Sequence, residues 1–188
     1  MTPHPLALPL CIALASFGAG AEPFLYVIDP ERSAVHFEVL HFGTSTIRGR
    51  VGAVSGGVTL DRSAGRGEVR LQIATGAIDT GLRVFDARLR EPDLLASTEF
   101  PVAHFVASQM RFENERLTEV RGEFTLRGVS QALSLYALRF ACQPGEGGGE
   151  VCGGDFEGFF RRSDFGMNFG LPFVGDRVRL FVAVQGRR

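Results

Sequence analysis

Apolar and polar residues alternate along much of the chain, most clearly from Ser33 to Gly43 (SAVHFEVLHFG). Successive side chains of a strand point to opposite faces, so this alternation predicts a half-buried strand with one apolar face. That face carries alternate residues of the segment: Val35, Phe37, Val39 and His41. The histidine ends the face beside a Phe-Gly turn, and it is either a satisfied polar residue or the polar end of a binding pocket.

The β pattern continues toward the C-terminus with turn signals at short intervals. Further strands are expected at 47–54, 68–73, 100–112, 117–126, 129–142, 155–162 and 178–185. Val58 and Leu60 continue the first of these strands after a break at Gly56-Gly57. About eight short strands with this spacing favour an antiparallel sandwich or barrel.

Residues 80–90 (TGLRVFDARLR) break the alternation and predict a helix. Apolar residues stand there at helical spacing: Leu82, Phe85 and Leu89. Asp79 or Thr80 can cap the start of the helix, and Pro92 ends it. One amphipathic helix among strands has to bury its apolar stripe, and in a barrel the available place is an open end.

The first 21 residues are expected to be a secretory signal peptide. An apolar run from Leu6 to Phe17 precedes Ala19-Gly20-Ala21, which fits the small-residue rule for cleavage. The run is too short to span a bilayer, because spanning needs roughly 20 apolar residues. Cleavage at that site predicts one domain over residues 22–188 and a periplasmic location.

Composition narrows the class of partner. The chain has 20 basic and 21 acidic residues, so nothing in its charge balance predicts a nucleic acid or an anionic membrane as partner. It has 17 Phe but no Trp and only 2 Tyr. Because Phe adds apolar area without a polar atom to satisfy, the simpler interpretation is a Phe-rich core, and the alternative is a lipid cavity.

Cys142 and Cys152 bracket a Gly-rich loop at 143–151 (QPGEGGGEV). In an exported chain two cysteines so placed are expected to pair, and the disulfide would staple the ends of a hairpin. The alternatives are a reactive thiol or a metal site, and zinc is disfavoured because no His lies nearby. We expect neither a metal nor a cofactor.

Common catalytic motifs are missing from the sequence, including the Gly-x-Ser-x-Gly elbow, His-Glu-x-x-His and the phosphate loop. His36 and His104 alternate with apolar neighbours and are expected on outward faces. Asp86 is either part of a local ion pair with nearby arginines or a polar anchor at a cavity mouth. A buried Arg162 needs a partner. Asp164 is the obvious candidate for it, and recognition of a polar head group is the alternative.

Short motifs occur in order from Tyr26 to the C-terminus. They are YVIDP and SAVHF (26–30, 33–37), HFG and IRG (41–43, 47–49), AIDTG (77–81), FPVAHF (100–105), LRGV (126–129), RSDFGM (162–167) and VGDRV (174–178). This ordered set resembles the YceI-like family of exported, lipocalin-like lipid-binding proteins. Arg88 stands where a His is common in that family, which points to a different, anionic head-group preference.

The resemblance implies an all-β, eight-stranded antiparallel barrel with an apolar pore, closed at one end by the short helical insertion. It implies a non-enzymatic protein that transports or stores a long-chain isoprenoid lipid, such as a polyprenyl phosphate or an isoprenoid quinone, or a fatty-acid-like amphiphile. Two alternatives stay open. One is an enzyme that acts on a lipid through His41, Asp86 and Arg162, and the other is a stress or interaction protein whose barrel is filled by side chains. A homodimer also stays open, because Tyr136 and Phe181 leave apolar surface.

The expected lipid site has an apolar wall and a few polar contacts. The apolar set is Val35, Phe37, Val39, Phe85, Leu89, Phe105, Phe124, Phe160, Phe165, Met167 and Phe169. The polar set, expected at the head group or in ion pairs of the wall, is His41, Asp86, Arg88 and Arg162. Phe181 is placed outside the barrel.

Overall fold

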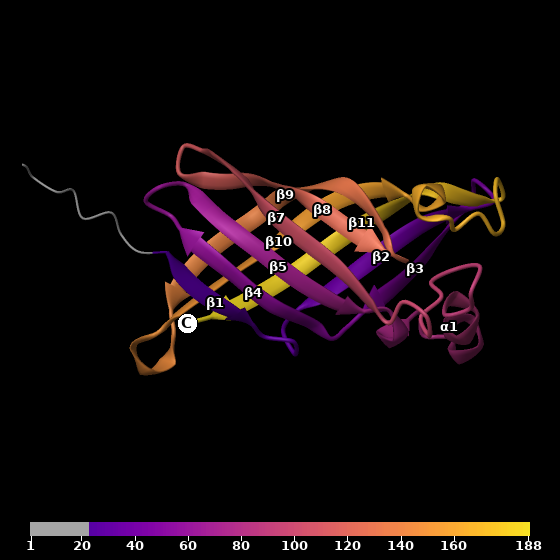
Figure 1. The fold of residues 1–188 in the computed structure, drawn as a ribbon, viewed down its shortest axis with the longest axis horizontal. Helices are drawn as coiled ribbons and strands as arrows, with labels where there is room; N and C mark the ends of the chain where they lie inside the picture. Colours follow the sequence, from indigo (N-terminus) through magenta and orange to yellow (C-terminus); the bar gives the residue numbers. More distant parts are fainter. Residues whose placement is uncertain (1–22) are drawn as a thin grey trace, which may run out of the picture.

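The computed structural model describes residues 23–188, which form a β-barrel with one short helix at one end (Figure 1). This confirms the all-β barrel fold that the sequence predicted. The predicted signal peptide, residues 1–21, lies outside the described residues. Within residues 23–188 no helix has both the length and the apolar composition needed to cross a membrane.

Eleven strands of the described part of the chain form one continuous antiparallel sheet. They are β1 (Phe24–Ile28), β2 (Ala34–His41), β3 (Ser45–Val51), β4 (Val54–Asp61), β5 (Arg66–Ala74), β6 (Ile78–Asp79), β7 (Val102–Glu113), β8 (Arg116–Leu126), β9 (Val129–Pro144), β10 (Glu150–Arg161) and β11 (Val174–Arg187). The helix α1 spans Arg83–Leu89, and short 3₁₀ turns lie at Thr75–Ala77, Glu146–Gly148 and Arg162–Phe165. Eight strands close the barrel in the order β1-β4-β5-β7-β8-β9-β10-β11, because β1 also pairs with β11.

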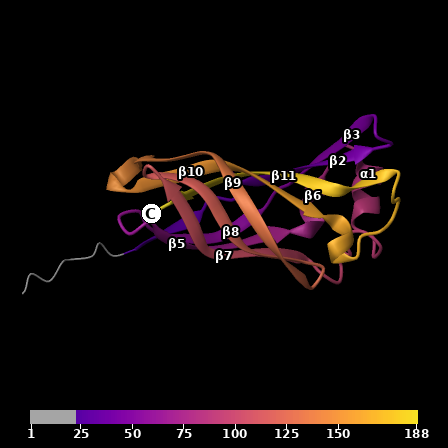
Figure 2. The same ribbon diagram turned by 90° about the horizontal axis from the view of Figure 1, so that it is seen from above.

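The long strand β11 is shared by both ends of the barrel. Near its C-terminus Arg187 lies opposite Val27 of β1, whereas closer to its N-terminus Leu180 lies opposite Phe37 of β2. The β2–β3 hairpin then reaches β6, which follows β5 in the chain. β2, β3 and β6 therefore continue the wall at the end that carries α1, beyond the ends of β1 and β4 (Figures 1 and 2).

The break between β3 and β4 comes earlier than the sequence predicted. The pattern predicted one strand over 47–54 and a break at Gly56, but β3 ends at Val51 and β4 begins at Val54. Gly56 lies inside β4 with a φ of 122°. Only glycine adopts this backbone conformation readily, so the glycine marks a local distortion within a strand and not a turn.

The helix α1 begins later than the sequence predicted. Its N-cap residue is Leu82, and no side chain caps it, so the expected caps Asp79 and Thr80 were wrong. Instead the Asp86 carboxylate, inside the helix, accepts hydrogen bonds from the backbone N–H and the hydroxyl of Thr80, at 2.8 and 2.6 Å. The extended chain before α1 is thereby held against the helix that follows it.

Candidate ligand-binding cavity

A cavity of about 370 Å³ lies inside the barrel at the end that carries α1. Small-molecule sites in proteins have volumes of about 300–1,000 Å³. Apolar side chains from the inward faces of the strands and from α1 make up nearly the whole wall. The filled-barrel alternative requires side chains to occupy the interior, and at this end of the barrel they do not.

Most of the side chains that the sequence predicted for the site lie in this one wall. Those that line the cavity are Val35, Phe37, Val39, His41, Phe85, Arg88, Leu89, Phe105, Phe124, Phe160, Arg162, Met167 and Phe169. The inward facing of the strand residues among them was predicted from the alternation of apolar and polar residues in the sequence. Their contact with a ligand stays a prediction.

The prediction missed several lining residues. Leu71 and Ile73 of β5 and Leu133 of β9 lie in the wall, and the same alternation that identified β2 would have found them. Leu94 and Leu95 also line the cavity, from the turns that follow α1. No periodic pattern marks these two, because they belong to no regular element.

Two predicted site residues do not line the cavity. Phe165 is only 2 % exposed and packs behind the wall, with its ring centroid 5.5 Å from that of Phe124 and 5.3 Å from that of Phe160. Asp86 is buried and bonded to Thr80, and it takes part in none of the ion pairs within residues 23–188, so the ion-pair alternative for this residue was wrong. The Thr80 hydroxyl lowers the pKa of the Asp86 carboxyl below its ordinary value, although burial opposes this.

Arg162 is a buried cation in the cavity wall, with 5 % of its surface exposed. Its guanidinium donates four hydrogen bonds of 2.8–2.9 Å to backbone carbonyl oxygens, those of Met167, Phe169, Val174 and Gly175. The expected partner Asp164 was wrong, because it is exposed and none of the ion pairs within residues 23–188 involves Arg162. Burial lowers the pKa of Arg162, and the charge of Asp176 opposes the effect.

Arg88 and His41 lie where the cavity meets solvent. Arg88 donates two hydrogen bonds of 2.6 Å to the Asp93 carboxylate, and its guanidinium carbon lies 4.2 Å from the ring centroid of Phe169. His41 is half-buried, and its ring packs edge-on against Phe42 at 4.5 Å. The cavity wall brings His41 and Arg162 together but leaves out Asp86, the third residue of the catalytic alternative.

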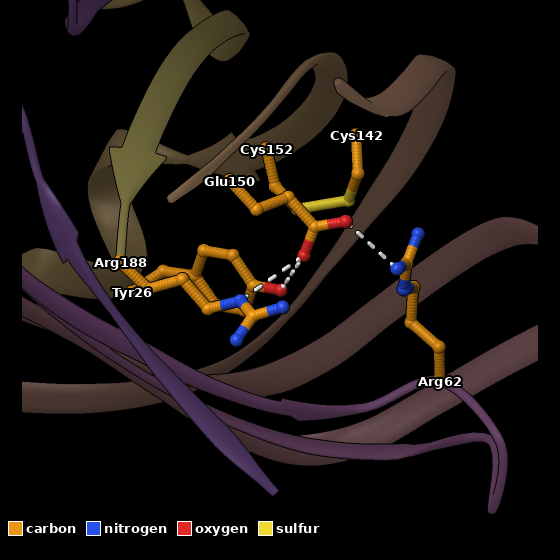
Figure 3. The surroundings of a disulfide bond; sticks show 6 residues. All are labelled: Tyr26, Arg62, Cys142, Glu150, Cys152 and Arg188. Atoms are coloured by element: carbon orange, nitrogen blue, oxygen red, sulfur yellow. Dashed lines mark hydrogen bonds and ion pairs between the residues drawn. A yellow bond between two sulfur atoms is a disulfide. The ribbon is translucent and has the colours of Figure 1, made fainter. Parts of the chain in front are cut away.

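A polar cluster closes the opposite end of the barrel (Figure 3). The buried Tyr26 hydroxyl donates to the Glu150 carboxylate, which also accepts from Arg62 at 2.8 Å and from Arg188 at 3.2 Å. The bond from Tyr26 and the two arginines lower the pKa of Glu150 against the opposing effect of burial. Burial, with the nearby Glu150, raises the pKa of Tyr26.

The disulfide lies beside this cluster. Cys142 of β9 is directly opposite Cys152 of β10, and their sulfurs are joined at 2.01 Å, as the sequence predicted. Glu150 lies close enough to both sulfurs to suggest a metal site, but the disulfide uses the two thiols that a metal would need. The cavity inside the barrel next to Tyr26 and Cys152 has a volume of only about 70 Å³. The barrel therefore has one hollow end and one nearly filled end.

The sequence model of the YceI-like domain family matches residues 26–186. The chain belongs to the YceI-like domain family. Protein YceI of Shigella flexneri is 29 % identical to this YceI-like chain over 183 residues, which cover 95 % of each chain. Protein YceI of Escherichia coli O157:H7 is 28 % identical over the same length and coverage.

Solved structures share the fold of this YceI-like domain. BcnA of Burkholderia cenocepacia has a TM-score of 0.68 at 18 % identity, covering 84 % of this chain and 98 % of its own. The YCEI protein of Campylobacter jejuni has a TM-score of 0.68 at 20 % identity, and the match covers 79 % of this chain and 89 % of the Campylobacter jejuni chain. A polyisoprenoid binding domain of Saccharophagus degradans, implicated in plant cell wall breakdown, has a TM-score of 0.59 at 16 % identity, covering 86 % and 97 %.

Proposed function

We propose that this YceI-like domain binds one long-chain isoprenoid lipid, or a similar amphiphile, in the cavity beneath α1 and carries or stores it unchanged in the periplasm. The observation that carries the proposal is a cavity of about 370 Å³ with an almost wholly apolar wall. Burial of an apolar chain gains about 0.8 kcal/mol per methylene. The cost of ordering the chain reduces that gain, and the affinity that is left comes from burial and needs no catalytic group.

The lipid tail would lie along the β2 face and point into the barrel. Val35, Phe37 and Val39 form one side of the wall, and Phe85 and Leu89 of α1 cover the outer end. The floor consists of the residues that border both the large and the small cavity: Leu71, Phe105, Leu135 and Val182. This floor limits how deep a tail can reach.

The head group would lie at the mouth, within reach of His41, Arg88 and Arg162. Arg88 is already paired with Asp93, so its charge is largely compensated. Among residues 23–188, no carboxylate pairs with Arg162. Its four bonds to carbonyl oxygens use four of the five guanidinium N–H groups, so one remains. A polyprenyl phosphate or a quinone carbonyl offers acceptors for such a donor. Asp86 would act indirectly, by holding α1 in place.

Two further observations support the location and the ligand class. A disulfide persists in oxidising compartments such as the periplasm, and Cys142 and Cys152 are joined. The apolar run before Ala19-Gly20-Ala21 supports export. The Saccharophagus degradans domain that shares the fold is described as polyisoprenoid binding, which supports an isoprenoid ligand for this chain.

Reloading of the delipidated protein tests the proposal. The protein is stripped of lipid by organic extraction on a column, refolded, and titrated with an isoprenoid quinone and with a fatty acid of similar length. Binding should saturate at about one lipid per chain, because an eight-stranded barrel holds one slender ligand. The lipid should be recovered chemically unchanged after long incubation. Absence of saturable binding for both lipid classes would overturn the proposal, and a chemically altered lipid would favour an enzyme.

A further inference from the structure

The most exposed large apolar side chains of residues 23–188 gather at the end that carries α1. Their exposed fractions are 87 % for Val84, 66 % for Leu82, and 61 % for both Phe42 and Phe173. They come from the β2–β3 turn, the start of α1 and the loop before β11, which Figure 1 shows at one end of the barrel. The Phe42 and Phe173 ring centroids are 5.5 Å apart. We call these four residues and Phe169 the mouth rim.

The mouth rim borders the cavity directly. Phe42 follows the lining residue His41, and Val84 precedes the lining residue Phe85. Phe169 itself lines the cavity while 54 % of its surface is exposed. One side of each rim segment thus faces the cavity and the other faces solvent, so any ligand that enters at this end passes between the exposed apolar residues.

Charge at the mouth rim is sparse and positive. The three segments that carry it, 42–44, 82–85 and 166–173, contain Arg83 as their only charged residue and no carboxylate. Exposed apolar patches mark protein or membrane contacts. Two acidic groups close to the rim are already bound, Asp93 by Arg88, which lies over Phe169, and Asp86 by Thr80. Apolar and aromatic side chains beside an arginine suit the interface of a bilayer, where the arginine remains at the level of the phosphates.

We propose that the mouth rim docks on the surface of a phospholipid bilayer with anionic head groups, and that the lipid passes between bilayer and cavity while the protein is docked. This inference rests on the lipid binding proposed above. A lipid with a long apolar tail has a negligible concentration in water, because every exposed methylene is unfavourable. Its source is therefore a membrane, and the opening through which it enters has to face that membrane.

Flotation with vesicles of phosphatidylethanolamine and phosphatidylglycerol tests the docking. The double variant Phe42→Ser/Phe173→Ser removes two rim residues that do not line the cavity. The matched control is Tyr136→Ser/Leu138→Ser, which changes residues that are 52 % and 55 % exposed on β9. The rim variant should bind vesicles at least about tenfold more weakly, because it loses two interfacial aromatic groups, whereas the control should bind like the wild type.

The charge contribution is tested with Arg83→Gln. Binding to the anionic vesicles should fall about fivefold, since an arginine near an anionic surface contributes about that factor. Binding to vesicles of phosphatidylcholine should not change. Equal binding of the rim variant and the wild type, or no binding of the wild type to anionic vesicles, would overturn the docking proposal.

Uptake of a short-chain, water-soluble isoprenoid quinone separates docking from lipid binding. The rim variant should take up this soluble quinone like the wild type but should extract a long-chain quinone from vesicles much more slowly. If the wild type takes up the soluble quinone and ignores vesicles, docking is wrong and lipid binding stands. If it takes up neither quinone, the proposed function fails. A dimer that the rim variant converts to a monomer, without vesicle binding, would assign the rim to a second copy and overturn membrane docking.

Discussion

Arg162 anchors the loop that leads from β10 into β11. Its guanidinium satisfies four carbonyl oxygens at the mouth, on Met167, Phe169, Val174 and Gly175. The sequence showed that a buried arginine needs a partner, but the natural candidate was a charged neighbour. Backbone carbonyls leave no trace in a sequence, because every residue has one. This is the physical reason why the chemistry of the site was predicted less well than its apolar wall.

Substitution of Arg162 by Met should destabilise the fold strongly. The carbonyl oxygen of Met167, whose bond to Arg162 is buried, and three part-buried carbonyl oxygens would lose their donor. Each buried group without a partner costs about 1–3 kcal/mol, so we expect the free energy of unfolding in urea to fall by about 3–5 kcal/mol. Arg161→Met is the control, because Arg161 is exposed and surface changes stay within about 0.5 kcal/mol. A loss for Arg162→Met as small as that of the control would contradict the assigned role.

Phe37 and Phe181 provide a matched pair that tests which side of the wall faces a ligand. Phe37 lines the cavity, whereas Phe181 lies on the outer face with the Arg179 guanidinium 4.2 Å from its ring centroid. An unpaired charge in an apolar wall costs several kcal/mol, so Phe37→Arg should abolish lipid loading. Phe181→Arg should load like the wild type. Titration with an isoprenoid quinone measures the lipid loading of both variants. Equal loading would show that the assignment of Phe37 to the inner face and Phe181 to the outer face is wrong.

At the scale of elements, α1 shows where local patterns reach their limit. Helical spacing correctly indicated a helix whose Phe85 and Leu89 face the cavity. The start of the helix was wrong because the bond between Asp86 and Thr80 leaves the preceding residues extended. The strand break predicted at Gly56 was also wrong, because a glycine can mark a distortion inside a strand as well as a turn. Element boundaries depend on such contacts more than on composition.

Asp86→Asn should lower the melting temperature at neutral pH. The bond from Thr80 lowers the pKa of Asp86, so its contribution is fully present above the ordinary aspartate value of about 4 and is lost as the pH falls through the lowered value. The difference in melting temperature between wild type and variant should therefore be clear at pH 7 and vanish in strong acid. Calorimetry measures it, with exposed Glu91→Gln as control. A difference that stays constant with pH would contradict the assignment.

The disulfide stabilises the β9–β10 hairpin at the closed end. Cys142 and Cys152 are separated by 10 residues, and a loop of that size corresponds to about 3 kcal/mol in the chain-entropy model. Reduction with dithiothreitol should lower the free energy of unfolding in urea by that amount. Lipid loading should persist, because neither cysteine lines the large cavity. Loss of loading in a folded, reduced protein would show that the two ends are coupled.

At the scale of the whole molecule, the barrel is asymmetric. The end near β1 is closed by Tyr26, Glu150 and the disulfide around about 70 Å³ of space, whereas the end near α1 holds about 370 Å³. The spacing of the strands left a sandwich or a barrel open, the resemblance to the YceI-like family implied the barrel, and the barrel is confirmed. The sequence placed the helix and the lipid site at an open end, but it did not indicate where the hollow stops, because the floor formed by residues such as Leu71 and Phe105 depends on the register between strands far apart in the chain.

Extraction of lipid from the protein purified from its native host is the most direct test of the cavity as a lipid site. Mass spectrometry of the extract should identify a long-chain isoprenoid or a similar amphiphile in amounts close to that of the protein. The Phe37→Arg protein, purified in parallel, should yield none, and the Phe181→Arg protein should yield as much as the wild type. Recovery of no isoprenoid or acyl lipid from the wild type, or equal recovery from all three proteins, would contradict the account.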